Sequence, residues 1–220
     1  MNKYKIDPIH GSKNKNKGII PLPLRCLIVG TSECGKTNLL YNLITRDEVY
    51  LSIICTFFQN LWNKVYEKVS AKEVEQIAHF FSSCEELILF NNCIPNSLVV
   101  WDDCVNIKQQ IIKDYFVRGR HKNISCVYLT QSYTKVDKQL IRNNINFLCV
   151  FRQGSRYVKD IYDEYVGTDF TFERFKEICN SCWNEDYAFL TIGTTKKLNV
   201  GRYKTKVWRT NKRLTLNIKR

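Results

Sequence analysis

The sequence predicts an α/β protein with a mostly parallel central sheet flanked by helices. Short apolar runs alternate with segments in which apolar residues recur at helical spacing, the pattern of a doubly wound sheet. The runs are almost continuously hydrophobic, as expected for strands buried on both faces. The first run leads into a glycine-rich loop and then a helical segment, and in such sheets ligands bind at the carboxyl ends of the strands.

Residue type and spacing predict the individual elements. Runs rich in β-branched and aromatic residues predict strands at Arg25–Val29, Leu51–Phe57, Leu87–Phe90, Leu98–Trp101, Ile124–Leu129, Phe147–Phe151 and Tyr187–Ile192. Apolar residues at helical spacing predict helices over Asn38–Thr45, Val65–Phe81, Ile107–Phe116 and Tyr157–Tyr165.

Composition limits the class of protein. A chain of 220 residues with 44% hydrophobic residues suits one globular domain with small additions. The apolar runs are far shorter than the ~18 residues of a membrane-spanning helix, and no apolar stretch follows the basic N-terminus. We therefore expect an intracellular protein without a membrane span, whose ten cysteines are reduced thiols. For the one Cys-x-x-Cys pair, Cys179 and Cys182, packing is favoured over a metal or redox role because no second pair has zinc-site spacing.

The net charge of +13 is concentrated at the two ends of the chain. Residues 1–25 carry +5 and residues 187–220 carry +10, whereas the remainder carries −2. We therefore divide the chain into a basic flexible arm over 1–24, a globular domain over 25–192 and a basic β-hairpin or tail over 193–220.

The C-terminal part predicts a strand with a cationic face. Arg202, Lys204 and Lys206 are two positions apart along the chain, so in a strand, with its period of two, they share one face. Such a face could lie along DNA phosphates, a contact that is strong at low salt and indifferent to base sequence. A solvated surface is the alternative.

Residues 30–37 match the phosphate-binding pattern G-x-x-x-x-G-K-[ST], between a predicted strand and a predicted helix. In such a loop backbone N–H groups surround the phosphates, and the N-terminus of the new helix points at them. We expect Lys36 to reach the β- and γ-phosphate oxygens and the Thr37 hydroxyl to bind Mg²⁺. The residues expected to bind ATP are Gly30, Thr31, Ser32, Glu33, Cys34, Gly35, Lys36, Thr37 and Asn38.

Two further strand ends carry polar groups suited to hydrolysis. Asp102 and Asp103 follow the run Leu98–Trp101, and we expect Asp102 to hold Mg²⁺ through water and Asp103 to orient or deprotonate the attacking water. Gln131 follows the run Ile124–Leu129 and is a candidate sensor, because an amide can register the loss of the γ-phosphate without adding charge. The alternatives are a helix cap for the acidic pair and a turn residue for Gln131.

Arg118 and Arg120 lie in a basic segment just before that strand. Arginines on a loop are what a neighbouring subunit could insert against a γ-phosphate to spread transition-state charge. We slightly favour Arg120 for this role in trans. Binding of DNA phosphate or simple solvation are the alternatives.

The order of these motifs resembles the FtsK/HerA superfamily, most closely the genome-packaging ATPases of poxviruses and other large DNA viruses, virophages and Polinton-like elements. The resemblance runs from about Arg25 to Arg152, and its narrowest part is the segment ending in Leu129-Thr130-Gln131-Ser132. Many relatives have Glu where this chain has Asp103, which is one methylene shorter.

This resemblance implies an additional-strand ATPase fold and a pentameric or hexameric ring with ATP at the subunit interfaces. It implies translocation of double-stranded DNA into a preformed capsid through a vertex or portal, at assembly sites in the host cytoplasm or nucleus. Lys36 and Thr37 match the phosphate-loop pair, Asp102 and Asp103 the acidic pair, and Gln131 the glutamine that closes the next strand. Arg118 or Arg120 matches the arginine that acts in trans.

Two other functions remain open from the residues alone. The first is a small-molecule kinase, for which the chain shows no clear lid segment. The second is a nucleotide-dependent switch, which would not need the complete set of hydrolytic residues.

Overall fold

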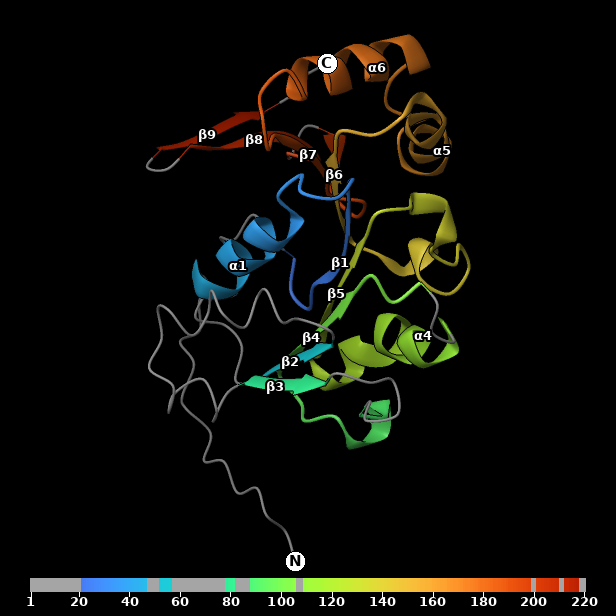
Figure 1. Cartoon of the computed structure of the whole chain (residues 1–220). Helices are drawn as coiled ribbons and strands as arrows, with labels where there is room; N and C mark the ends of the chain where they lie inside the picture. Colours follow the sequence, from blue (N-terminus) through green and yellow to red (C-terminus); the bar gives the residue numbers. More distant parts are fainter. Residues whose placement is uncertain are drawn as a thin grey trace, which may run out of the picture.

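A computed structural model describes residues 21–46, 52–56, 78–81, 88–105, 109–198, 201–209 and 212–217. In these ranges the chain forms a nine-stranded sheet with the order β3-β2-β4-β5-β1-β6-β7-β8-β9 (Figure 1). The strands are β1 (Arg25–Val29), β2 (Ser52–Thr56), β3 (Ala78–Phe81), β4 (Ser97–Asp102), β5 (Ser125–Thr130), β6 (Phe147–Phe151), β7 (Phe189–Ile192), β8 (Tyr203–Arg209) and β9 (Lys212–Asn217). The helices are α1 (Lys36–Arg46), α4 (Gln109–Arg118), α5 (Ser155–Tyr165) and α6 (Phe172–Cys182), with the 3₁₀ segments η2 (Phe90–Asn92), η3 (Gly119–Lys122), η4 (Tyr133–Lys135) and η5 (Arg142–Asn144).

The strands from β3 to β6 in this order are parallel, whereas β7, β8 and β9 are antiparallel to their neighbours. β5 lies between β1, which leads into the phosphate loop, and β4, which ends in Asp102. The mostly parallel sheet with flanking helices, in which β5 lies between these two strands, confirms the predicted fold class. The hairpin of β8 and β9 continues the sheet beyond β7, and it forms the predicted C-terminal β extension.

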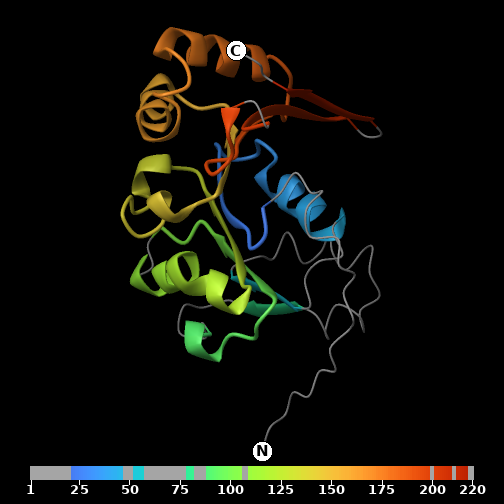
Figure 2. The same ribbon diagram turned by 180° about the vertical axis from the view of Figure 1, so that it is seen from behind.

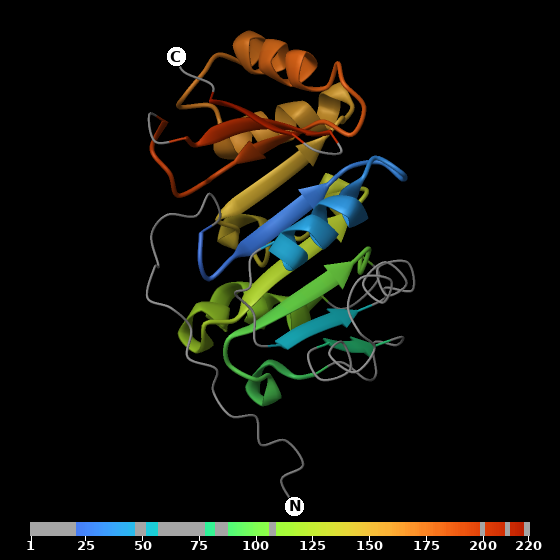
Figure 3. The ribbon, with the colours of Figure 1, turned by 90° about the vertical axis from the view of Figure 1, so that its left-hand side faces the viewer.

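Helices cover both faces of the sheet. α1 lies against one face, and α4 and α5 lie against the other (Figures 1 and 2). Alternate residues of β1 divide between the two cores: Cys26 and Ile28 pack with Leu39 and Leu40 of α1, and Leu27 joins the other core. Figure 3 shows α1 in front of β1, with the parallel strands side by side behind it. Burial on both faces explains the continuous hydrophobicity of these strands.

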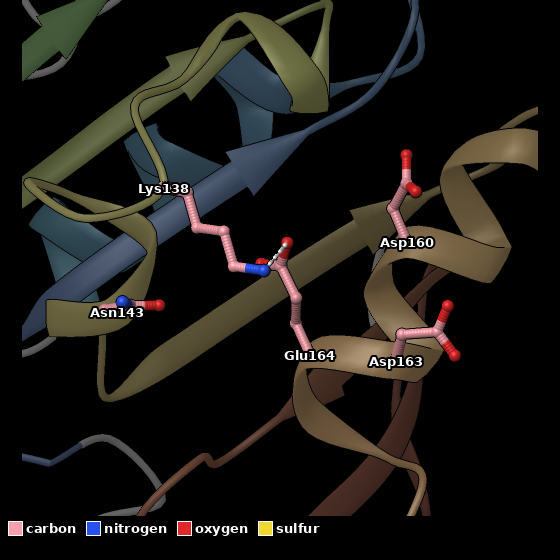
Figure 4. A pocket seen from close by; sticks show the side chains of 5 residues that line it. All are labelled: Lys138, Asn143, Asp160, Asp163 and Glu164. Atoms are coloured by element: carbon pink, nitrogen blue, oxygen red, sulfur yellow. Dashed lines mark ion pairs between the residues drawn. The ribbon is translucent and has the colours of Figure 1, made fainter.

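A buried ion pair anchors α5 to the segment that connects β5 to β6. Glu164 accepts hydrogen bonds from Arg142 at 2.6 Å and from the Tyr133 hydroxyl at 2.7 Å. The side chains of Arg142 and Glu164 are only 10% and 11% exposed. Lys138 pairs with the same carboxylate at 3.6 Å from the rim of a cavity (Figure 4). These contacts hold the chain that follows Gln131 against α5.

Most predicted elements are confirmed, with specific exceptions. The strands β1, β2, β4, β5 and β6 match their predicted ranges to within one residue. The strand predicted over Leu87–Phe90 is wrong, because Phe90 begins η2 and Leu89 is extended outside the sheet. Phe81, predicted to be helical, is the last residue of β3. In an apolar run as short as this one, helical and strand periodicity cannot be distinguished. The helix α6 was not predicted. No helix in the described ranges combines the length and hydropathy that crossing a bilayer requires.

Two helix predictions fall partly outside the described residues. Of the predicted helix Val65–Phe81, only the residues of β3 are described, and Ile107 precedes the first described residue of α4. The proposed arm over 1–24 is described only from residue 21 onward.

Candidate functional site

The phosphate loop connects β1 to α1 and has the backbone that its motif requires. Gly35 has a φ of 102° and Glu33 a φ of 61°, both in the left-handed region. Gly30 lies in close contact with its surroundings: a Cβ at this position would be 2.4 Å from the Cys34 Sγ and 2.7 Å from the Phe151 Cβ. Only glycine fits there, so this position fixes the course of the loop.

Lys36 lies across the loop at the start of α1. Its Nζ donates to the carbonyl oxygens of Gly30 at 2.7 Å and Thr31 at 2.6 Å. The loop residues Thr31 to Glu33 are exposed, and Thr37 is half-buried in the first turn of α1. The ammonium group therefore lies at an open, polar surface, where phosphate oxygens can replace the two carbonyl oxygens.

β5 holds both of the loops that carry the candidate catalytic groups. The backbone N–H of Gly30 donates to the Thr130 carbonyl at 3.2 Å, and that of Asp103 donates to the Leu129 carbonyl at 2.9 Å. The amide of Gln131, directly after β5, donates to the Asp103 carboxylate at 3.4 Å. The structure thus brings the phosphate loop, the acidic pair and Gln131 together at one edge of the sheet.

The two carboxylates of the acidic pair differ in environment. Asp103 is exposed and has a φ of 47°, whereas Asp102 is half-buried at the end of β4. Burial raises the pKa of Asp102 to about 6; the neighbouring charge of Asp103 adds to this rise, and the ammonium of Lys36 opposes it. A partly desolvated carboxylate beside a second carboxylate is a suitable ligand for a hard divalent cation. Asp102 and the Thr37 hydroxyl therefore fit the Mg²⁺ role that the sequence predicts for them.

Arg118 and Arg120 lie at the opposite edge of the sheet. Arg118 ends α4, with its guanidinium 4.8 Å from the centre of the Phe90 ring and 3.7 Å from Asp114. Arg120 is exposed in η3, which precedes β5. Burial lowers the pKa of Arg25 at the start of β1, and the nearby charge of Arg120 lowers it further. A six-residue strand spans about 20 Å. Neither arginine can therefore reach the phosphate loop of its own chain, and a role in trans stays a prediction.

Two other sequence interpretations can be compared with the structure. Arg202 does not present its charge to solvent: it pairs with Asp169 at 2.8 Å and donates to the carbonyls of Tyr165, Thr194 and Lys196. Arg202 is therefore not part of the predicted phosphate-facing surface, because period-two spacing does not reveal these partners. For Lys204 and Lys206 that surface stays a prediction.

The Cys-x-x-Cys pair lies within α6. Cys179 and Cys182 are both buried, and burial raises the pKa of each thiol to about 12. In the described ranges, no three His, Cys, Asp or Glu side chains are grouped so that they could hold a metal ion. Their position agrees with packing, since protonated thiols are poor metal ligands.

Sequence reasoning missed a cavity beside the phosphate loop. It is lined by the loop, by Phe151 and Arg152 at the end of β6, and by the turn before β7. Arg152 could have been found by the rule that identified Gln131, because it too directly follows a predicted strand. Tyr187 was assigned to a strand, but β7 begins at Phe189, and Tyr187 has a φ of 59° in the preceding turn.

Solved structures share this fold. The genome packaging NTPase B204 from Sulfolobus turreted icosahedral virus 2, in complex with sulfate, aligns with a TM-score of 0.60 and 12% identity over 83% of this chain and 96% of that chain. Its complex with ATP-gammaS gives a TM-score of 0.57 at the same identity and coverage. B204 of Sulfolobus Turreted Icosahedral Virus, described as a DNA-packaging ATPase, gives 0.57 at 15% identity over 84% and 97% of the two chains.

Sequence comparisons give a family as well as a fold. A search of curated proteins found no significant match. The family model described as "Poxvirus A32 protein" matches residues 12–165, a range that includes the phosphate loop, the acidic pair and Gln131. Since this match covers more than half of the 220 residues, the chain belongs to the Poxvirus A32 protein family.

Proposed function

We propose that this protein is an ATPase that drives double-stranded DNA into a preformed viral capsid. The observation that carries the proposal is the convergence of Lys36, Asp102, Asp103 and Gln131 at one edge of an additional-strand sheet. Family membership and the shared fold of the packaging ATPases support it. The kinase and switch alternatives gain no support from the structure.

The residues at this edge divide the work of hydrolysis. The loop N–H groups, Lys36 and the first turn of α1 bind the phosphates and neutralise part of their charge. Thr37 and Asp102 would hold Mg²⁺, which would supply positive charge to stabilise the transition state of phosphoryl transfer. Asp103 orients the attacking water and holds its proton at a carboxylate oxygen, and Gln131 fixes that carboxylate by its hydrogen bond.

The charged ends of the chain and the opposite edge of the sheet suggest how DNA and neighbouring subunits take part. The basic ends, residues 1–25 and 187–220, would bind DNA phosphates by counterion release, apart from Arg202, whose charge is paired with Asp169. Arg118 or Arg120 would reach the γ-phosphate of an adjacent subunit in a pentameric or hexameric ring, since its own site is one strand length away. Such rings would act on a capsid vertex or portal at assembly sites in the infected cell.

The first test is steady-state ATP hydrolysis at low salt, with and without double-stranded DNA. We expect DNA to stimulate hydrolysis, the stimulation to fade as salt rises, and Lys36→Ala to abolish activity without loss of folding. Lys176→Ala, which removes an exposed lysine from α6, is the matched control and should retain activity. Hydrolysis by Lys36→Ala at the wild-type rate would remove the loop from the mechanism.

A mixing experiment tests the trans arginine. Arg120→Ala lacks the donated arginine but keeps an intact phosphate loop, whereas Lys36→Ala has the reverse defect. In mixed rings, some interfaces combine Lys36 of an Arg120→Ala subunit with Arg120 of a Lys36→Ala subunit. We therefore expect partial recovery of hydrolysis. A mixture as inactive as its components contradicts the assignment of Arg120.

A further inference from the structure

The cavity beside the phosphate loop is built by three segments that the sheet order brings together. It has a volume of about 360 Å³ and is lined by Ser32 to Cys34 of the loop, by Phe151 and Arg152, and by residues 183 and 185–188. β6 lies next to β1, and β7 is antiparallel to β6. The turn that precedes β7 therefore lies at the same edge as the ends of β1 and β6, on the side away from the acidic pair.

The turn that forms the outer wall is held firmly in place. The buried indole of Trp183 donates from Nε1 to the Val150 carbonyl of β6 at 3.1 Å. Phe151 also lines the cavity, and its ring packs against that of Phe189 with the ring centres 5.2 Å apart. The backbone N–H of Ala188 donates to the Glu185 carbonyl at 3.3 Å. The wall is thus preformed, as is usual for small-molecule sites.

Tyr187 is the aromatic side chain that this turn presents. Its φ of 59° is in the left-handed region, which bulky residues rarely adopt. Its side chain is among the exposed large hydrophobic ones, at 59% exposure. The ring nevertheless lies against the phosphate loop, because a Cβ added to Gly35 would be 3.3 Å from the Tyr187 Cδ1. An exposed ring held beside the loop by an unfavourable backbone conformation is typical of a functional position.

Polar groups surround this ring. Arg152 and Asp186 also line the cavity, and neither forms an ion pair with any residue in the described ranges. A cavity with an aromatic wall and a polar rim suits a nucleobase, whose flat faces are apolar and whose edges and ribose are polar. Its volume is in the range of ligand pockets.

We propose that this cavity binds the nucleoside part of the nucleotide whose phosphates occupy the loop, and that the Tyr187 ring stacks on the base. The proposal rests on the proposed ATPase function. It adds to the phosphate loop a binding site for the base and ribose of the same nucleotide. Because the loop and the cavity share Ser32, Glu33 and Cys34, a single ligand can fill both. The recognition is by stacking, so Tyr187 contributes affinity for nucleotides and none for phosphate chains that lack a base.

Two probes and two variants test this proposal. The dissociation constants of ATP and of inorganic tripolyphosphate are measured by titration calorimetry. Tyr187→Asn removes the ring but tolerates the left-handed backbone, and Tyr187→Phe keeps the ring in the same strained position. We expect Tyr187→Asn to weaken ATP binding roughly tenfold and to leave tripolyphosphate binding unchanged, whereas Tyr187→Phe matches the wild type with both probes.

The outcomes separate this inference from the proposed function. Unchanged ATP affinity in Tyr187→Asn overturns the inference, and so does an equal loss of both probes, because Tyr187 would then only support the loop. Failure of the wild type to bind either probe, or wild-type binding of both by Lys36→Ala, would instead contradict the phosphate loop assignment. A melting temperature of Tyr187→Asn at or above that of the wild type shows that the turn has kept its structure.

Discussion

Replacing Asp102 by asparagine should stabilise the nucleotide-free protein while abolishing its hydrolysis. The pKa of Asp102 rises from 3.8 to about 6, first through burial and then through the adjacent charge of Asp103. Each pKa unit corresponds to 1.36 kcal/mol. At pH 8 the ionised carboxylate therefore lowers the free energy of unfolding by up to about 3 kcal/mol. An asparagine amide is uncharged but still polar, and we expect a gain of about 2 kcal/mol.

The sign of the pH dependence follows from linkage. A raised pKa means that the folded state binds the proton more tightly than the unfolded state. The stabilisation from the protonated carboxyl is complete below its ordinary pKa of 3.8 and is lost as the pH rises through 6. The advantage of Asp102→Asn over the wild type should therefore be largest at pH 8 and shrink by more than half at pH 4.

Thermal unfolding with a chelator present, followed by circular dichroism at pH 8, 6 and 4, measures this advantage. At ~2–4 °C per kcal/mol for a chain of this size, Asp102→Asn should melt about 4–8 °C higher than the wild type at pH 8. Asp103→Asn is the matched control, because Asp103 is exposed and asparagine tolerates its left-handed φ of 47°; its shift should be much smaller. An advantage of Asp102→Asn that is equal at pH 4 and pH 8, or absent at both, would refute the reasoning.

Three further results are expected. Glu164→Ala should lower the free energy of unfolding in urea by about 3–5 kcal/mol, because it leaves the buried guanidinium of Arg142 without its carboxylate; a loss below about 1 kcal/mol would mean that water replaces the partner. Gly30→Ala should abolish ATP binding, since its Cβ would be 2.4 Å from the Cys34 Sγ, whereas Gly154→Ala, with nothing within 4 Å, should bind ATP normally. The logarithm of the DNA affinity should fall linearly with the logarithm of the salt concentration, with a slope of several units; a flat line would exclude the basic ends as the DNA contact.

Much of the candidate site could be predicted because its residues directly follow recognisable strands. Lys36, Asp102 and Gln131 each come shortly after a buried apolar run, and parallel strands bring their carboxyl ends to one edge. The motif of the phosphate loop and the apolar run before the acidic pair are local signals that a single sequence contains. The resemblance implied only the additional-strand fold class; the strand pairing is what places β5 between β4 and β1.

The residues that escaped prediction depend on contacts distant in sequence. The left-handed backbone of Tyr187 and the bond from Trp183 to Val150 follow from how the turn packs on β6. Arg202 reads as one cation of an alternating strand, but its partner Asp169 lies on another segment. Spacing along the chain cannot reveal such pairs, because tertiary contacts override the local pattern.

Two groups of the candidate site, Lys36 and Asp102, have features that phosphate and a divalent cation can offset. Lys36 donates to the carbonyls of Gly30 and Thr31, which already belong to the loop, and Asp102 has an ionised form that burial disfavours. Phosphate oxygens offer Lys36 a charged acceptor in place of neutral carbonyls, and a divalent cation offsets the charges of both Asp102 and Asp103. Phosphate and cation thereby act on different groups, so nucleotide and cation together should stabilise the fold by more than either alone. Because β5 is bonded to the loops that carry both groups, that stabilisation acts on the centre of the sheet as well as on its edge.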